Sequence, residues 1–246
     1  MKKILPIIMF CIIICISCEE SEPKPQELEV STTKISLNSG YSENIVSISD
    51  FDILYESEND FHASVSNLGK VTAVKVGNTT VKVSSNGKSI NVLVEVIPLY
   101  TTYPTPIIDW NKTRSSIISA NGQPDAESGD VIGYEDYSTK APMVMYMFDS
   151  NGKLESTAVM VRSAYSSELG SYIAERYQFV GEQDGIIVSA DALEPSKMEM
   201  AVAVSLYDLN YWMVMYMPYS SSGLKSSEDI YSIVLKTKEI FRKELK

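Results

Sequence analysis

The sequence has very little cysteine and histidine. Its three cysteines, Cys11, Cys15 and Cys18, lie within the first 18 of 246 residues, and His62 is the only histidine. A disulfide framework, a Cys/His zinc site and a histidine-based catalytic triad all need more of these residues. The sequence therefore excludes these three kinds of site, and we expect neither a metal nor a cofactor.

Positive charge is also scarce. The chain has 21 Lys and Arg against 32 Asp and Glu, a net charge of −11. Nucleic-acid binding depends on a cationic excess that neutralises phosphates and releases counterions, so no nucleic-acid partner is expected. A content of 44% apolar and 22% charged residues is that of a globular chain with one or two domains.

The N-terminus carries an apolar segment that is too short to span a membrane. Lys2 and Lys3 precede residues 4–16, which are apolar except for Pro6. A spanning helix needs about 20 apolar residues, whereas a basic start and a short apolar run are typical of a signal peptide. We predict a signal peptide over residues 1–17, followed by an acidic tether over residues 18–27.

The end of this segment resembles the lipobox of bacterial lipoproteins. Small Ser17 precedes Cys18, and the chain then becomes acidic and proline-rich; the departure is Cys15, where the family usually has Leu, Val or Ile. The resemblance implies that Cys18 is lipidated and that the protein is an outer-membrane lipoprotein anchored to the membrane. The acidic residues 19–22 resemble a surface-export tag, although a periplasmic orientation and an ordinary secretory signal stay open as alternatives.

Residues 28–97 show short alternating apolar segments separated by turn signals, which predicts an all-β sandwich. Asn86-Gly87 lies between two alternating segments and predicts a type I′ hairpin, because both turn residues need a positive φ.

Within this region, Gly69-Lys70-Val71-Thr72-Ala73 and the following residues up to Val83 resemble the core motif of group 2 bacterial immunoglobulin-like (Big2) domains. Tyr55 stands where that family more often has Trp. The resemblance covers about 70 residues and implies an immunoglobulin-like module that acts as a spacer or in adhesion. Five acids between Asp50 and Asp60 could bind calcium, but their spacing favours solvated loops, and His62 is expected at a loop or sandwich edge.

A proline-rich linker is expected over residues 98–107 and a second domain over residues 108–246. In the second domain we expect a helix capped by Asp109 and ended at Gly122, three strands (131–137, 143–148 and 155–161), and a helix from Ser167 to Tyr177. Three more strands (186–190, 198–206 and 211–217) and a helix opened by Ser226 and Asp229 follow. This order predicts an α+β domain with one antiparallel sheet covered by helices on one face, an architecture that resembles duplicated inhibitor-like and TATA-box-protein-like folds.

Methionine is concentrated in three of these expected strands. Met-Val-Met-Tyr-Met occurs at 143–147 and again at 213–217. The first copy is the second expected strand after its helix, whereas the second copy is the third, so an internal duplication stays open. Alternate residues share one face of a strand, so each copy forms a row of thioethers. Such rows suit Cu(I), which makes a copper-binding protein one alternative; packing of a sheet-to-helix core is the favoured interpretation.

Acidic pairs provide a catalytic alternative. Glu135 and Asp136 with Glu182 or Asp184 could act as acid and base of an envelope hydrolase. Asp149-Ser150-Asn151-Gly152 begins like a calcium loop but lacks the glutamate at position 12, so a hairpin turn is expected there. No nucleophile elbow or phosphate-binding loop is present, and we expect no enzymatic activity.

Tyrosine is abundant, with 15 residues against six Phe and two Trp. Aromatic rings with polar tips at strand ends are suited to binding glycans or proteins. The candidate binding residues are Tyr207, Tyr211, Trp212 and Tyr219. The sequence thus predicts a non-enzymatic surface binding or adhesion lipoprotein, in which a Big2-like spacer carries a C-terminal recognition domain; an inhibitor-like domain is a further alternative.

Overall fold

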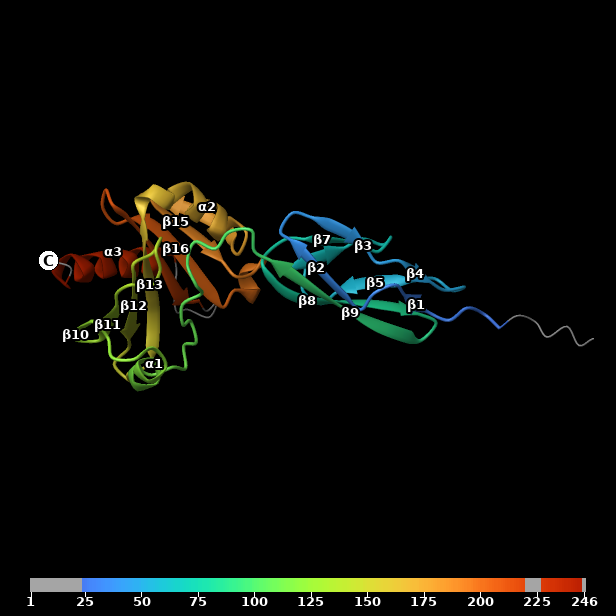
Figure 1. Ribbon diagram of the computed structural model, residues 1–246, viewed down its shortest axis with the longest axis horizontal. Helices are drawn as coiled ribbons and strands as arrows, with labels where there is room; N and C mark the ends of the chain where they lie inside the picture. Colours follow the sequence, from blue (N-terminus) through green and yellow to red (C-terminus); the bar gives the residue numbers. More distant parts are fainter. Residues whose placement is uncertain (1–23, 220–226, 245–246) are drawn as a thin grey trace, which may run out of the picture.

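The computed structural model describes residues 24–219 and 227–244. The expected signal peptide, Cys18 and Ser226 lie outside these residues. The described chain is elongated, with a narrow region of small sheets at one end and a wider region around one large sheet at the other (Figure 1). We call these the N-terminal region (residues 24–97) and the C-terminal region (residues 98–244).

The N-terminal region consists of nine strands. They are β1 (Glu29–Val30), β2 (Lys34–Asn38), β3 (Ser42–Asn44), β4 (Ser47–Ile48), β5 (Leu54–Ser57), β6 (Ala63–Val65), β7 (Lys70–Ala73), β8 (Gly77–Ser85) and β9 (Lys88–Ile97). A sheet of order β2-β9-β8-β5 and a sheet of order β3-β7-β6 enclose one apolar core, and β1 pairs with β4. The core is rich in valine, as expected for a sandwich of alternating strands.

The expected hairpin between β8 and β9 is confirmed. Asn86 and Gly87 both have a positive φ, 46° and 78°, which is the conformation of a type I′ turn. The alternating residues 71–76 do not form one strand, however, because β7 ends at Ala73 and β8 begins at Gly77 in the other sheet. Residues 74–76 cross between the sheets, and Val76 N–H donates to the Glu175 carbonyl of the C-terminal region at 2.8 Å.

The C-terminal region contains three helices and eight strands within the described residues. They are α1 (Arg114–Asn121), β10 (Ala126–Ser128), β11 (Val131–Tyr134), β12 (Met143–Phe148), β13 (Leu154–Arg162), α2 (Ser166–Ala174), β14 (Gln178–Gln183), β15 (Ile186–Ala190), β16 (Met200–Leu206), β17 (Tyr211–Pro218) and α3 (Ser227–Glu244). The sheet is antiparallel throughout, with the order β10-β11-β12-β13-β17-β16-β15-β14. Two sets of a helix and four strands therefore meet at β13 and β17. The sequence predicted three strands per set, because β10 and β14 are edge strands with little apolar alternation.

The start of α1 differs from the expectation. Thr113, not Asp109, caps the helix: its hydroxyl accepts from Ser116 N–H, and the Ser116 hydroxyl accepts from Thr113 N–H. This reciprocal pair satisfies two backbone donors at the helix start. The Asp109 carboxylate instead accepts from Asn111 N–H in the preceding turn. Asp109 therefore stabilises this turn and does not cap the helix.

The expected coverage of the sheet by helices on one face is wrong. Alternate residues of each central strand belong to two separate apolar clusters, one packed by α1 and α2 and the other by α3. Val144 and Tyr146 of β12 face α1 and α2, whereas Met145 and Met147 face α3. We call the face of the sheet that carries Met145 and Met147 the methionine face. It is apolar along several neighbouring strands, so it must be buried as well, and α3 packs against it.

The repeated pentapeptide has a structural explanation in β13. Both copies pair with this one strand from opposite sides and in the same register: Ala158 is opposite Met145 on one side and Met215 on the other. Met160 likewise lies between Met143 and Met213. The copies are the third strand of one set and the fourth strand of the other, so they do not occupy equivalent positions of a duplication. The two methionine rows instead lie beside the same residues of β13.

Candidate functional site

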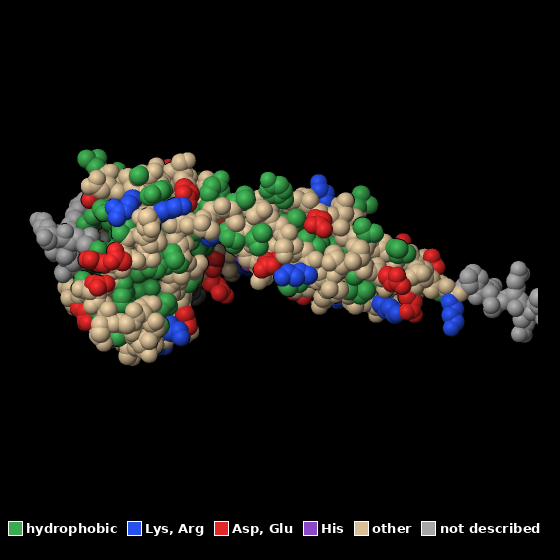
Figure 2. Space-filling view, in the orientation of Figure 1, with side chains coloured by type: hydrophobic (Ala, Val, Ile, Leu, Met, Phe, Trp, Pro, Cys, Tyr) green, Lys and Arg blue, Asp and Glu red, His purple; other side chains and the backbone are tan. Residues whose placement is uncertain are grey.

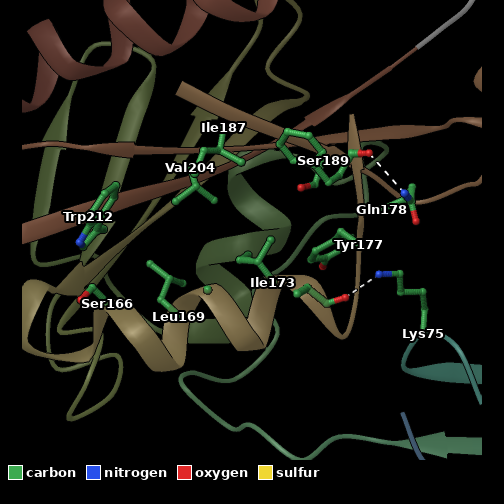
Figure 3. A pocket seen from close by; sticks show the side chains of 13 residues that line it. Lys75, Ser166, Leu169, Ile173, Tyr177, Gln178, Ile187, Ser189, Val204 and Trp212 are labelled. Carbon is green, nitrogen blue, oxygen red and sulfur yellow. Dashed lines mark hydrogen bonds between the residues drawn. The ribbon is translucent and has the colours of Figure 1, made fainter. Parts of the chain in front are cut away.

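An apolar groove lies between α2 and the half of the sheet formed by β14–β17. Leu169 and Ile173 of α2 form one wall, and Ile187, Val204 and Trp212 of the strands form the other (Figure 3). The groove has a volume of about 310 Å³. This volume is at the lower end of the range of roughly 300–1,000 Å³ that is typical of small-molecule sites.

Apolar residues and an exposed glycine of α2 border this groove. Leu169, Tyr172 and Ile173 place apolar side chains on the sheet-facing side of α2. Gly170 also borders the groove, and a Cβ added there would meet no atom within 4 Å. A larger side chain at this position would fill space that the structure leaves empty.

The two ends of the groove differ in chemistry. Trp212 and Ser166 lie at one end, and Lys75 lies at the other (Figure 3). Lys75 belongs to the N-terminal region, and its ammonium donates to the carbonyl of Ala174, the last residue of α2, at 2.6 Å. A cation at this position interacts favourably with the negative end of the helix dipole. Burial lowers the pKa of Lys75 below its usual value, because desolvation disfavours the charged form.

Polar contacts next to Lys75 connect the two regions. The buried Glu175 carboxylate accepts from Leu99 N–H at 2.9 Å and from Tyr100 N–H at 3.1 Å, and it forms an ion pair with Arg176. Arg176 also donates to the Tyr100 carbonyl at 3.0 Å. Together with the bond from Val76, these contacts hold the crossing segment 74–76 and the start of the linker against the end of α2.

A group of buried tyrosines lies at this end of α2. The Tyr103 and Tyr216 hydroxyls are 2.8 Å apart, and the Tyr103 ring packs on Tyr172 with centroids 4.5 Å apart. Burial raises the pKa of Tyr103 and Tyr216 well above the usual value. Thr102 and Tyr103 are buried, so the expected linker packs against the sheet along this part of its length.

The structure does not bring the four candidate aromatic residues together. Tyr207, Tyr211 and Tyr219 pack against the cluster on the α3 side of the sheet, whereas Trp212 packs on the α2 side. Tyr211 and Trp212 are neighbours in β17, so their side chains point to opposite faces. Only Trp212 lines the groove. The sequence showed no signal for the groove itself, because its other lining residues look like ordinary core or turn residues.

The methionine rows are buried. Met213, Met215 and Met217 have no exposed area, and Thr237 of α3 donates to the Met147 sulfur at 3.6 Å. Methionine here fills the space between sheet and helix, as its flexible side chain allows. The copper alternative needed rows that solvent can reach, and the structure does not provide them.

The acidic pairs do not converge. Glu135 and Asp136 follow β11, and Glu182 and Asp184 lie in and after β14; five strands separate β11 from β14. At about 4.8 Å per strand this separation is roughly 29 Å, whereas glycosidase carboxylates lie about 5–9.5 Å apart. The strand order therefore does not bring these acidic pairs together as neighbours in the sheet.

Neither of the two acidic segments considered for calcium, residues 50–60 and the turn at Asp149, is arranged as a metal site in the described residues. The Asp149 carboxylate accepts from Asn151 N–H and Lys153 N–H, both at 2.9 Å, as expected for a hairpin turn. A polar cavity of about 570 Å³ between residues 57–61 and 191–199 contains Glu58 and Asp60. Among the described residues, no three His, Cys, Asp or Glu side chains are grouped so that they could hold a metal ion.

On the described part of the face shown in Figure 2, acidic and basic side chains are interspersed, without a continuous basic patch. In residues 24–219 and 227–244, no helix has the length and apolar character needed to cross a membrane.

Comparison with known families identifies part of the chain. Residues 26–92 match the model of the bacterial Ig-like domain, group 2. The Big2 resemblance of the N-terminal region is thereby confirmed, and we call residues 26–92 the Ig-like region. No curated protein matches the sequence.

Solved structures give limited similarities. Domains 4 and 5 of the S-layer protein SbsC share 23% identity over 30% of this chain and 52% of theirs, with a TM-score of 0.27, so the chain spans about half of that structure. SbsC domains 5-6 share 16% identity over 82% of this chain and 87% of theirs, with a TM-score of 0.26. Human protocadherin-24 EC1-2 shares 12% identity over 79% of this chain and 94% of its own, with a TM-score of 0.25. At these TM-scores, nothing known of those proteins is transferred to this chain.

Proposed function

We propose that this chain is a non-enzymatic binding lipoprotein of the cell envelope. In this proposal Cys18 carries the lipid anchor at the outer membrane, and the Ig-like region is a spacer. The C-terminal region holds a surface-displayed site for an apolar ligand or an apolar group of a partner. The groove under α2 is the observation that carries the proposal.

The groove is suited to binding because it is open and apolar. Phe179 at its border is 59% exposed, and Ile187 and Trp212 are half-buried. Covering such surface with an apolar ligand is favourable by about 25 cal/mol per Å². The opposite face of the sheet is covered along its centre by α3, so the two faces differ in how much apolar surface they leave available.

The lining supports binding rather than catalysis. Of the thirteen residues that line the groove, Lys75 is the only charged one, and none is Asp, Glu, His or Cys. General acid–base and nucleophilic catalysis both need a base held next to a nucleophile or acid. The lining does contain the hydroxyls of Ser166, Tyr177 and Ser189, but the Lys75 ammonium donates to the Ala174 carbonyl rather than to one of them.

The shape of the chain is consistent with a spacer. The N-terminal end of the described chain leaves the Ig-like region at the end farthest from the eight-stranded sheet (Figure 1). An anchor on that side would place the groove at a distance from the membrane. The bonds around Glu175 would keep the Ig-like region and the groove in a defined orientation.

Gly170→Leu tests the proposal by filling the groove. The protein without residues 1–17, and with Cys18→Ser to prevent acylation, is titrated with the neutral fluorescent probe N-phenyl-1-naphthylamine. We expect Gly170→Leu to weaken binding at least about tenfold. Its thermal stability should stay equal or rise, since Gly is about 0.8–1 kcal/mol less favourable than Ala in a helix interior and Leu ranks next after Ala.

Gly181→Leu is the matched control. A Cβ at Gly181 also meets no atom within 4 Å, but this residue borders a different cavity, next to α3. We expect its probe affinity to equal that of the unmodified protein. Equal affinity in all three proteins would show that the groove is not the site, and loss in Gly181→Leu alone would move the site to the α3 side.

A further inference from the structure

Lys75 joins the Ig-like region to the groove of the C-terminal region. It lies in the segment that crosses from β7 to β8, yet its ammonium borders a groove whose other lining residues all come from the C-terminal region. A pure spacer has no need to supply a side chain to the site that it carries.

The Lys75 ammonium has donor capacity left for a ligand. Of its three N–H donors, one is used by the Ala174 carbonyl at 2.6 Å. No carboxylate of the described residues forms an ion pair with it within 4.0 Å. A partly buried ammonium without an anionic partner is stabilised by a ligand anion, because the opposite charge favours its charged form.

The rest of the groove is suited to a hydrocarbon chain. Leu169 and Ile173 face Ile187 and Val204 across it, and Trp212 closes the end opposite Lys75 (Figure 3). An extended peptide would bring backbone N–H and C=O groups that each need a partner, and burying such a group unpaired costs free energy. An aliphatic chain has no such groups.

We propose that the groove binds a single-chain aliphatic carboxylate, with the carboxylate at Lys75 and the chain extending under α2 toward Trp212. The inference rests on the proposed function, and it adds that the Ig-like region supplies the group that selects the ligand. One ammonium matches one negative charge, which favours a carboxylate over a phosphate dianion that would need more donors.

Ligands of equal chain length and different head groups test this proposal on the unmodified protein. Dodecanoate and dodecylammonium are titrated below their critical micelle concentrations and dodecanol below its solubility limit, with Trp fluorescence and calorimetry as readouts. We expect dodecanoate to bind at least about tenfold more tightly than dodecanol, because a charge-assisted hydrogen bond stabilises the complex. Dodecylammonium should bind most weakly, and added salt should weaken only the dodecanoate complex.

Substitutions of Lys75 then locate the effect. Lys75→Gln should reduce dodecanoate affinity about tenfold, to the level of dodecanol, and leave dodecanol unchanged. Lys75→Arg retains the charge and should retain the preference for the carboxylate. Far-UV circular dichroism and the thermal midpoint report whether either variant perturbs the end of α2.

The outcomes separate the two proposals. If neither dodecanoate nor dodecanol binds, both the proposed function and this inference are overturned. Equal affinities for the two ligands, or a Lys75→Gln variant that keeps the preference, overturn this inference alone. The comparison of head groups needs no variant, so it tests the preference for a carboxylate even if Lys75→Gln does not fold.

Discussion

The two regions differ in how many faces of their β-sheets are buried. In the N-terminal region each sheet has one buried face, and β8 and β9 alternate between buried and exposed residues. In the C-terminal region the large sheet is covered on both faces, and β11 and β16 are buried almost without interruption. Alternation is therefore visible only where one face meets solvent, whereas a strand covered twice is apolar throughout.

The residue types differ accordingly. The N-terminal core is formed mainly by valine between two thin sheets, while the C-terminal sheet separates a face rich in tyrosine from a face rich in methionine. The tyrosine face carries polar hydroxyls and an open groove, and the methionine face carries α3. Two faces of one sheet thus have separate roles, which a single-core sandwich does not offer.

The largest effect is expected from a charge in the cover of the methionine face. Val234 of α3 has no exposed area, whereas its neighbour Leu235 is 59% exposed. Val234→Asp would bury an unpaired carboxylate, and we expect a loss of about 3 kcal/mol or more in unfolding free energy, measured by urea denaturation. Leu235→Asp should change it by less than about 0.5 kcal/mol. Similar effects of both substitutions would contradict the burial of both faces.

The connection between the regions should give an intermediate effect. Glu175→Ala removes the acceptor of Leu99 N–H and Tyr100 N–H and leaves Arg176 without its ion pair. Because buried donors lose their partner, we expect a loss of about 2 kcal/mol and faster chymotrypsin cleavage near residues 99–103. Glu182→Ala, at an exposed position, is the control. Unchanged cleavage and stability would show that Glu175 does not hold the two regions together.

The smallest effect concerns a contact at the border of the C-terminal region. Glu168 accepts from Lys140 Nζ at 2.6 Å and from Thr102 Oγ1 at 3.1 Å, and the bond from Lys140 lowers the pKa of Glu168 below 4.5. Because both charged side chains are partly exposed, Glu168→Gln should cost only about 0.5–1 kcal/mol at pH 7.

The pH dependence of this variant follows from the lowered pKa. The folded protein favours the charged carboxylate, so the stabilisation is fully present above pH 4.5 and is lost as the pH falls through the lowered pKa. The difference between Glu168→Gln and the unmodified protein in urea denaturation should be constant from pH 7 to about pH 5.5 and disappear in more acidic buffer. A difference that grows on acidification would contradict the contact.

Much of the fold could be predicted from local patterns. The Ig-like region, the turn at Asn86-Gly87, α2 and six of the eight strands of the large sheet follow from alternation, helical spacing and turn residues. The edge strands β10 and β14 were missed, because a short edge strand needs little apolar sequence. The cap of α1 was misplaced, because Asp109 and Thr113 are both good caps and only the reciprocal bond with Ser116 distinguishes them.

The groove could not be predicted in this way. Its walls come from α2 and four strands, and Lys75 is separated from Ala174 by 99 positions in the sequence. Leu169 and Ile187 look the same in a sequence whether they are covered by a neighbour or leave a gap. Trp212 was singled out as an aromatic residue at a strand end, but its partners in the sequence-based candidate site lie on other surfaces.

The sequence by itself determined much of the local structure of this protein: α2, six of the eight strands of the large sheet, the turn at Asn86-Gly87, and the pattern of a bacterial Ig-like domain in residues 26–92. These features depend on residues within a few positions of one another. The tertiary structure decided the rest, namely that β13 lies between the two strands that share the pentapeptide Met-Val-Met-Tyr-Met, that α3 covers the methionine face, and that Lys75 reaches the groove under α2. Each of these depends on contacts between distant segments, and the free energy of such contacts depends on the whole packed chain.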